Sequence, residues 1–289
     1  MQILEHEFMN RHTTFRVGGP ARFFCIPETE EELAEIVARC TAMDLPFTIV
    51  GRGSNLLVAD RGYLGVVIHV GDALAKAQVK GTTITAQAGI SLAALASYAC
   101  RMYLTGLEFA AGIPGSFGGA LLMNAGAYGG EMKDVVRSLR LMDPDGTIRE
   151  VDASWMEYDY RTSRAQKEGS IIVGATLELR PGDPKVIQAK MQELAARRRE
   201  KQPLEYPSAG SYFKRPKGRF AGALIEQAGL KGFRVGGAQV SEKHAGFVIN
   251  AGNATAADIA ALQDEVVRQV RERFGVTLEP EVKRLGNFR

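Results

Sequence analysis

A glycine-rich, uncharged stretch at residues 112–130 is the feature that most restricts how this chain can fold. It reads GIPGSFGGALLMNAGAYGG, and seven of its nineteen residues are glycine. Glycine lets backbone amides approach a ligand because it has no Cβ, at a cost in chain entropy. Ser116 or Gly115 could cap a short helix through Leu121–Met123, with Pro114 fixing its start. Free N–H groups at a helix start favour an anion, so the stretch predicts a cradle for a pyrophosphate; a tight, close-packed turn is the alternative.

A second glycine loop, Gly51-Arg52-Gly53-Ser54-Asn55, lies between an apolar strand expected at 47–50 and the apolar residues Leu56–Val58. It is not a dinucleotide fingerprint, because that motif has three spaced glycines opening a helix, and it is not a Walker A loop, because no Gly-Lys-Ser/Thr follows. Its amides, together with Ser54 and Asn55, could form an anion-binding nest. Two glycine loops in one domain suit a large dinucleotide better than a single phosphate.

Composition and charge are those of an ordinary globular protein. The 289 residues are 45% hydrophobic and 24% charged, with a net charge of +3 and a pI of about 8.7. This balance is too mild to indicate nucleic-acid binding. The cysteines lack a CxxC spacing and the histidines share no metal-ligand spacing, so we expect no disulfide framework and no metal site. With no signal-peptide pattern and no apolar run of ~18 residues, we expect a cytoplasmic protein with no membrane partner, and a monomer.

Hydrophobic periodicity and turn chemistry predict an α+β chain with two domains. Strands are expected at 22–26, 47–50, 66–70, 82–88, 139–142, 147–151, 171–179, 235–240, 245–250 and 278–285, and helices after Thr29 and at 91–103, 186–200, 222–229 and 256–274. Thr29 to Glu32 has the capping-box pattern, and residues 143–146 have the chemistry of a hairpin turn. Pro181-Gly182-Asp183-Pro184 marks a boundary. We therefore expect a first domain at 1–182, with lobes at about 1–74 and 75–182, and an α+β domain at 183–289.

Three segments carry side chains that could do chemistry. Arg161 lies in a loop between two expected strands, where a guanidinium is a surface charge by default but also suits a carboxylate or a phosphate. Ser211 has neither a Gly-x-Ser-x-Gly elbow nor a histidine close in sequence, so it is a proton donor or a turn residue rather than a nucleophile. Glu279 and Glu281 fall on one face of the expected last strand, because strand side chains alternate with a period of two.

A basic run, Arg197-Arg198-Arg199 with Lys201, lies on one expected helix. It is either a solvated helix face or a grip on a substrate phosphate.

Five segments, taken in order, closely resemble the UDP-N-acetylenolpyruvoylglucosamine reductases, FAD-containing enzymes of bacterial cell-wall (peptidoglycan) precursor synthesis. They are GRGSNLL at 51–57, GIPGS at 112–116 and on through Gly126, Tyr160-Arg161, AGSYFK at 209–214, and LEPEV at 278–282. The likeness extends from His12 to Gly286, and the short segment after Ser211 resembles the compact class of the family. The resemblance implies a two-lobed FAD-binding domain of the vanillyl-alcohol-oxidase type, followed by a substrate domain.

The resemblance also implies a reaction and the residues for it. NADPH reduces a non-covalent FAD, the flavin passes hydride to C3 of UDP-N-acetylglucosamine enolpyruvate, and UDP-N-acetylmuramate forms. Ser211 would give the proton to C2, while Arg161 and Glu281, chosen over Glu279, would hold and polarise the carboxylate. Cofactor contacts are assigned to Gly51, Arg52, Gly53, Ser54, Asn55, Leu56, Gly112, Ile113, Pro114, Gly115, Ser116, Gly119, Asn124 and Gly126. Substrate contacts are assigned to Tyr160, Lys201 and Lys214.

Two other kinds of protein stay open on the sequence. An oxidase of the vanillyl-alcohol-oxidase group would share the FAD domain, but those enzymes often tether the flavin through histidine or cysteine, and neither glycine stretch contains either residue. A non-catalytic nucleotide-binding module would have no need for Arg161, Ser211 and Glu281 to come together.

Overall fold

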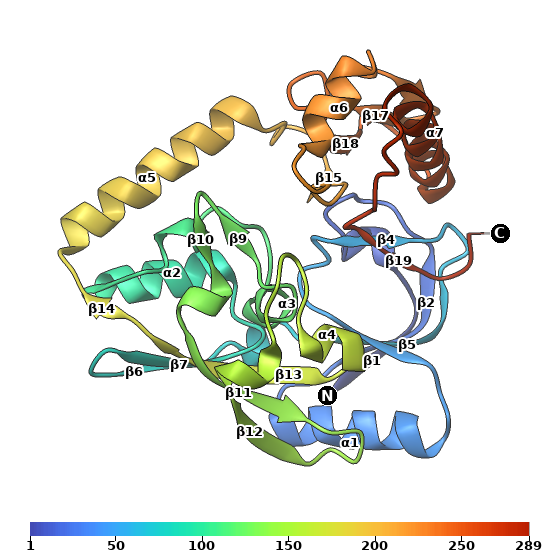
Figure 1. Cartoon of the computed structure of the whole chain (residues 1–289). Helices are drawn as coiled ribbons and strands as arrows, with labels where there is room; N and C mark the ends of the chain where they lie inside the picture. The colour runs from blue at the N-terminus through green and yellow to red at the C-terminus, as the bar shows by residue number, and fades with distance from the viewer. Residues whose placement is uncertain (289) are drawn as a thin grey trace. The chain divides into compact units, whose positions relative to one another are not determined.

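A computed structural model describes residues 1–288 of the chain (Figure 1). By compactness the chain divides into two units. Unit 1 comprises residues 1–4, 24–52 and 65–198, and unit 2 comprises residues 5–23, 53–64 and 199–289. The expected domains at 1–182 and 183–289 stay a prediction, because compactness assigns two early segments to the unit that also holds the C-terminal third of the chain.

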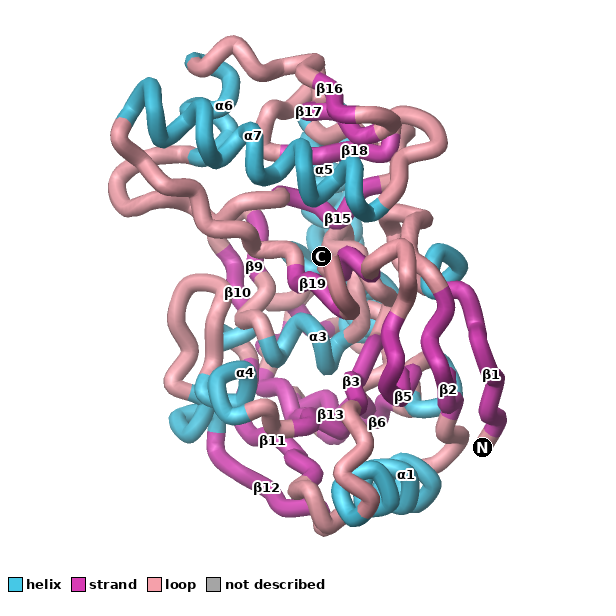
Figure 2. The backbone as a smooth tube through the Cα atoms, turned by 90° about the vertical axis from the view of Figure 1, so that its right-hand side faces the viewer, coloured by secondary structure: helices cyan, strands magenta, loops and turns pink. Residues whose placement is uncertain are grey.

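The first sheet has the strand order β1-β2-β5-β3, which can be followed across Figure 2. Its elements, with the helix α1 that precedes β3, are β1 (Gln2–Phe8), β2 (Pro20–Ile26), α1 (Glu30–Ala42), β3 (Phe47–Val50) and β5 (Tyr63–His69). Strands β3 and β5 pair in parallel. Thr29 caps α1 as expected, since its Oγ1 accepts the N–H of Glu32 at 3.2 Å. In a complete capping box the Glu32 carboxylate would accept the N–H of Thr29. Here it accepts the N–H of Glu28 instead, at 2.8 Å.

An antiparallel sheet with the order β12-β11-β13-β7-β6 forms the centre of unit 1. Its strands are β6 (Ala77–Lys80), β7 (Thr83–Gln87), β11 (Val136–Met142), β12 (Ile148–Asp152) and β13 (Ile171–Glu178). Helices α2 (Leu92–Arg101) and α3 (Phe117–Leu122) pack on it through buried Leu95, Phe117 and Leu121, so burial of apolar side chains holds the layer together. The hairpin expected around residues 143–146 is confirmed.

Unit 2 contains a sheet with the order β15-β18-β17-β16, and helices α6 and α7 pack with it (Figure 2). The elements are β15 (Ser208–Ser211), α6 (Ala221–Gln227), β16 (Arg234–Val235), β17 (Ala238–Val240), β18 (Phe247–Asn250) and α7 (Ala256–Phe274). Thr255 and Asp258 form a complete capping box at the start of α7, and Gly275 ends it in the left-handed conformation at φ +67°.

The early segment 53–64 is joined to the C-terminal part of unit 2 at two points. Strand β4 (Leu56–Val58) pairs in parallel with β19 (Lys283–Leu285), near the end of the chain. The Asp60 carboxylate accepts the backbone N–H groups of Ala256 at 2.8 Å and Ala257 at 2.9 Å, the first two residues of α7. These donors have no partner within the helix, so Asp60 supplies one.

Other elements connect these layers. They are β8 (Leu104–Thr105), β9 (Gly126–Ala127), β10 (Gly130–Glu131), α4 (Arg164–Glu168), β14 (Arg180–Pro181) and α5 (Pro184–Lys201), with 3-10 turns at Met9–Arg11, Asp72–Leu74, Glu108–Ala110, Met132–Asp134 and Ala153–Met156.

Two strand predictions in unit 2 are wrong in part. The strand expected at 235–240 is a tight hairpin, because Gly236 turns the chain at φ +52° between β16 and β17. The strand expected at 278–285 is regular only in β19, and before it Pro280 forms a single bridge with Phe213. Proline has no N–H to continue a ladder. Glu279 and Glu281 therefore precede the strand, and the two-residue alternation does not apply to them.

Candidate active site

The two glycine loops meet in unit 1. A Cβ on Gly51 would lie 2.1 Å from Ser116 Oγ, and one on Gly118 would lie 2.7 Å from the Cβ of Ala88. Ser116 is buried and caps α3, because its Oγ accepts the N–H of Gly119 at 3.4 Å. Gly51 therefore lets the end of β3 approach the start of α3, and Gly118 lets α3 approach Ala88, without side chains between them.

A cavity of about 360 Å³ lies at this junction. Its walls are formed by Phe47, Thr48, Ile49, Gly51, Val70, Ala88, Ser116, Gly118, Gly119, Leu122, Ala165, Gln166, Gly169, Ser170, Ile171 and Ile172. Four of these residues are glycines, and most of the others are apolar. A cavity of this character suits a ligand with a flat apolar ring next to an anionic group.

The second half of the 51–55 loop belongs to unit 2. Gly53 has φ +59°, and a Cβ there would lie 1.9 Å from the backbone oxygen of His12. Thr14 donates its N–H to Gly53 at 3.2 Å. Among the described residues, the buried Thr14 Oγ1 has no hydrogen-bond partner. The sequence pattern indicates no role for Thr14, although it lies close to His12, where the likeness to the family begins.

Ser211 and Glu281 lie on neighbouring segments of unit 2. Ser211 is exposed at the end of β15. The backbone N–H of Glu281 donates to the backbone oxygen of Tyr212, the residue that follows Ser211, at 2.8 Å. Burial raises the pKa of Tyr212 to about 12, and its hydroxyl donates to Gln263 Oε1 at 3.1 Å, so this side chain anchors the segment in the core.

The two glutamates differ in their surroundings. Glu279 is exposed, and its carboxylate forms an ion pair with the side chain of Lys214. The backbone N–H of Lys214 also donates to the backbone oxygen of Glu279 at 2.8 Å. Glu281 is half-buried, and its carbonyl oxygen accepts the side-chain amide of Asn55 at 3.1 Å. The environment of Glu281 thus adjoins the 51–55 loop within unit 2.

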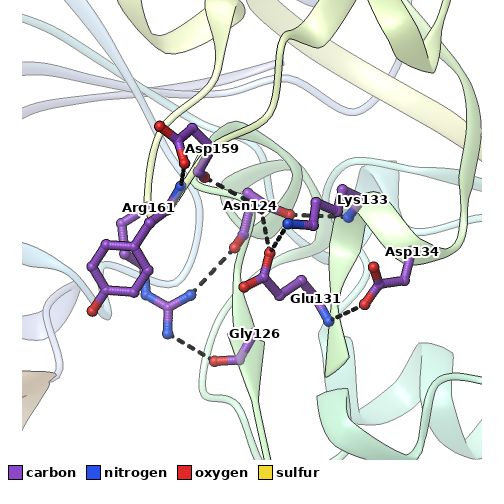
Figure 3. Close-up of polar contacts among 8 residues, drawn as sticks. Asn124, Gly126, Glu131, Lys133, Asp134, Asp159 and Arg161 are labelled. Atoms are coloured by element: carbon purple, nitrogen blue, oxygen red, sulfur yellow. Dashed lines mark hydrogen bonds and ion pairs between the residues drawn. The ribbon is translucent and has the colours of Figure 1, made fainter. Parts of the chain in front are cut away.

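Arg161 belongs to unit 1, in the loop between β12 and β13. Its guanidinium donates to the backbone oxygens of Gly126 at 2.8 Å and Asn124 at 3.3 Å (Figure 3). It also lies 5.3 Å from the ring centre of Tyr160. The sequence had placed Arg161 and the glycine-rich stretch in separate segments, and the fold brings them into direct contact.

The basic helix residues differ in their contacts. On α5, Arg197 forms an ion pair with Glu193 at 2.6 Å. Arg198 turns toward the glycine-rich stretch: its Cδ and one terminal nitrogen would lie 3.4 Å from a Cβ on Gly112. Burial lowers the pKa of Arg198, and its buried Nε has no hydrogen-bond partner among the described residues. Lys201 is exposed.

The candidate residues divide between the units. Unit 1 holds Gly51, Arg52, Gly112, Ile113, Pro114, Gly115, Ser116, Gly119, Asn124, Gly126, Tyr160 and Arg161, and unit 2 holds Gly53, Ser54, Asn55, Leu56, Lys201, Ser211, Lys214 and Glu281. Their roles as site residues stay predictions.

Comparison with known proteins identifies the chain as a flavoprotein. The FAD binding domain family matches residues 21–152, and the C-terminal domain of UDP-N-acetylenolpyruvoylglucosamine reductase matches residues 202–285. Reductases of that name from Lachnoclostridium phytofermentans and Syntrophomonas wolfei are each 50% identical over 285 residues; the alignments cover 97% and 99% of this chain and 92% and 95% of theirs. The chain belongs to the UDP-N-acetylenolpyruvoylglucosamine reductase family.

A solved structure agrees with this assignment. The reductase from Thermus caldophilus superposes with a TM-score of 0.85 at 36% identity, covering 99% of this chain and 100% of that one. The chain is therefore an FAD-dependent oxidoreductase of the α+β class expected from its sequence, and a peptidoglycan-synthesis enzyme. Across residues 1–288, none of the helices has the length and apolar character needed to cross a membrane.

Proposed function

We propose that this enzyme reduces UDP-N-acetylglucosamine enolpyruvate to UDP-N-acetylmuramate with NADPH as the reductant. Membership of the family supports the reaction. The structural observation that carries it is the pairing of the Ser211 and Glu281 segments through the 2.8 Å bond between Glu281 N–H and Tyr212 O. This bond keeps a hydroxyl and a carboxylate on adjacent, backbone-fixed segments, as a proton-transfer site requires.

The cofactor fits the two glycine loops. We assign the pyrophosphate to backbone amides within residues 51–55 and 112–116, where Pro114 has no N–H to donate; the close approach of Gly51 to Ser116 brings the two loops together and supports this assignment. The apolar walls of the adjoining cavity would take a ring of the same cofactor. When bound, FAD carries the hydride from NADPH to C3 of the enolpyruvyl group.

The side chains of the protein act on the other carbon and on the carboxylate. Hydride addition at C3 leaves negative charge at C2, delocalised onto the neighbouring carboxylate. Arg161 and Glu281 hold and polarise that carboxylate, so the developing charge is stabilised. Ser211 gives its hydroxyl proton to C2, and solvent restores it. Tyr160, Lys201 and Lys214 contact the rest of the substrate.

The test measures flavin chemistry directly. NADPH should bleach the yellow protein, and UDP-N-acetylglucosamine enolpyruvate should restore the colour while UDP-N-acetylmuramate forms. Without that substrate, aerobic NADPH oxidation should be slow. Acid precipitation should release all of the flavin. Reoxidation by oxygen as fast as by the substrate would instead identify an oxidase, and flavin left in the pellet would contradict non-covalent binding.

A further inference from the structure

Asn124 is the buried centre of a polar network that includes Arg161. Its side chain is 0% exposed. The Nδ2 group donates to Glu131 Oε2 at 2.9 Å and to the backbone oxygen of Asp159 at 3.3 Å, and Oδ1 accepts the N–H of Lys133 at 2.9 Å (Figure 3). Both ends of the amide are therefore used within the protein, and the side chain is turned inward.

The network joins two parts of the chain. Asp159 lies two residues before Arg161, so the bond from Asn124 to its carbonyl fixes the loop that carries the guanidinium. Arg161 in turn donates to the backbone oxygen of Asn124. A second clamp lies nearby, because the buried Ser163 donates its hydroxyl to the oxygen of Leu122 at 2.6 Å.

The backbone at both residues is unusual. Asn124 has φ +47° and Arg161 has φ +53°, in the left-handed region that non-glycine residues adopt rarely. Asparagine tolerates this region better than most side chains, whereas arginine has no such preference. Such a conformation persists only where surrounding contacts hold it, and it is concentrated at functional sites.

The partner of Asn124 is itself fixed. Glu131 forms an ion pair with Lys133 at 2.9 Å, and the N–H of Glu131 donates to Asp134 at 2.8 Å. Hydrogen bonds from Lys133 and Asn124 hold the pKa of Glu131 below its ordinary value. The carboxylate stays ionised near neutral pH, and so keeps accepting the Asn124 amide.

We propose that Asn124 is a positioning residue for Arg161. Its amide holds the backbone of the Arg161 loop against the glycine-rich segment and so fixes the guanidinium where it meets the substrate carboxylate. This inference rests on the proposed function only for the role that Arg161 has toward the substrate. A guanidinium orients a carboxylate through a planar fork of donors, so a shift of its loop misaligns that contact.

The test separates backbone conformation from the side-chain bonds. Asn124→Gly accepts a positive φ but has no amide. Asn124→Asp keeps the shape and the acceptor for Lys133, but an ionised carboxylate can donate neither to Asp159 nor to Glu131. Asn253→Gly is the matched control, because Asn253 is an exposed asparagine at φ +56° in unit 2. Arg161→Lys and the double variant with Asn124→Gly complete a cycle.

Three quantities are measured on each flavin-loaded variant. They are the rate of reduction by NADPH, the rate of reoxidation by the enolpyruvyl substrate, and the calorimetric Kd of UDP-N-acetylmuramate, which keeps the carboxylate but undergoes no reaction. Asn124→Gly and Asn124→Asp should slow reoxidation and weaken product binding by roughly 10- to 100-fold, the scale of a misplaced group. NADPH reduction and flavin content should match Asn253→Gly. The double variant should be no worse than Arg161→Lys, because both changes affect one interaction.

Other outcomes overturn the inference in distinguishable ways. If Asn124→Gly reoxidises at the parental rate while Arg161→Lys is slow, the positioning role is refuted and the proposed function stays intact. If the double variant is slowed by the product of the two single-variant factors, Asn124 acts independently of Arg161. Lost flavin, or equal slowing of both half-reactions, would assign Asn124 to the cofactor site. Parental behaviour of Arg161→Lys would remove the role of Arg161, and the inference with it.

Discussion

The side-chain amide of Asn55 donates a hydrogen bond to the backbone oxygen of Glu281 at 3.1 Å, across 226 positions of sequence. The backbone oxygen of Asn55 accepts the N–H of Lys283 at 3.0 Å. One residue of a glycine loop thus holds the segment of a candidate catalytic carboxylate from both sides. The 51–55 loop and the backbone around Glu281 therefore belong to one hydrogen-bonded unit.

Asn55→Ala should slow reoxidation by the enolpyruvyl substrate by roughly tenfold, because the half-buried backbone oxygen of Glu281 loses its donor and Glu281 shifts. Asn55→Asp should behave alike, since a carboxylate cannot donate to the Glu281 oxygen. Stopped-flow measurement of both half-reactions provides the check. A parental rate in Asn55→Asp would show that this hydrogen bond does not position Glu281.

Ser211→Ala should fold and bind FAD, because Ser211 is an exposed residue. Reduction by NADPH should stay near the parental rate, while reoxidation by substrate slows by about 10²–10⁴-fold, the usual effect of losing a general acid. Ser211→Cys should recover part of the rate, since a thiol can donate from nearly the same position. Reoxidation of the alanine variant at the parental rate would make Ser211 a turn residue only.

Gly51→Ala should purify with little flavin, because its new Cβ would lie 2.1 Å from Ser116 Oγ. Gly81→Ala is the control for an added methyl group: nothing lies within 4 Å of its Cβ. Its positive φ costs about 1–2 kcal/mol of stability, but flavin content should not change. The ratio of flavin to protein absorbance measures both. Full flavin content in Gly51→Ala would contradict the cradle.

Arg198→Ala should raise KM for NADPH or for the UDP substrate by about 10- to 100-fold, the loss expected for a charged hydrogen bond. The effect should weaken at high salt, with kcat nearly constant. Arg197→Ala is the matched control, because its guanidinium is paired with Glu193 on the same helix. Equal KM values in the two variants would leave this basic run as a helix face.

Asp258→Asn should reduce the acid sensitivity of unfolding. The N–H of Thr255 donates to the Asp258 carboxylate at 2.9 Å, and this bond holds the pKa of Asp258 below its ordinary value of 3.8. Its contribution, about 0.5–1 kcal/mol for a charge at a helix start, is present above pH 3.8 and lost as pH falls through the lowered pKa. Urea unfolding should show a smaller difference in the free energy of unfolding between the parent and Asp258→Asn at pH 3 than at pH 7. An equal difference at both pH values would refute the assignment.

Local sequence chemistry predicted most elements of the fold. The Thr255 cap, the turn at 143–146 and the cap at Ser116 depend on residues within four positions of one another, so they can be recognised without tertiary information. The hairpin at Gly236 was missed because its flanking strands have two and three residues, too short for a periodic signal.

The site could be predicted only as a set of segments. The likeness to the reductase family selected Arg161, Ser211 and Glu281, but their surroundings arise from contacts between distant segments. The bond from Asn55 to Glu281 and the bonds from Arg161 to Gly126 leave no mark in local sequence. Asn124 illustrates the difference: as one residue of a glycine-rich stretch it suggested cofactor contact, whereas its buried amide bonds point to the loop of Arg161.

The pairing of β4 with β19 has a consequence for how the protein is made. Residues 56–58 leave the ribosome long before their partners at 283–285. Asp60 likewise accepts a hydrogen bond from the first turn of α7, and Phe15 packs against core residues from 209 onward, so both contacts form only once those later residues are made. We therefore expect unit 1 to be able to fold while synthesis continues. Unit 2, and with it the second half of the 51–55 loop, would be completed only after residues 283–285 have emerged from the ribosome.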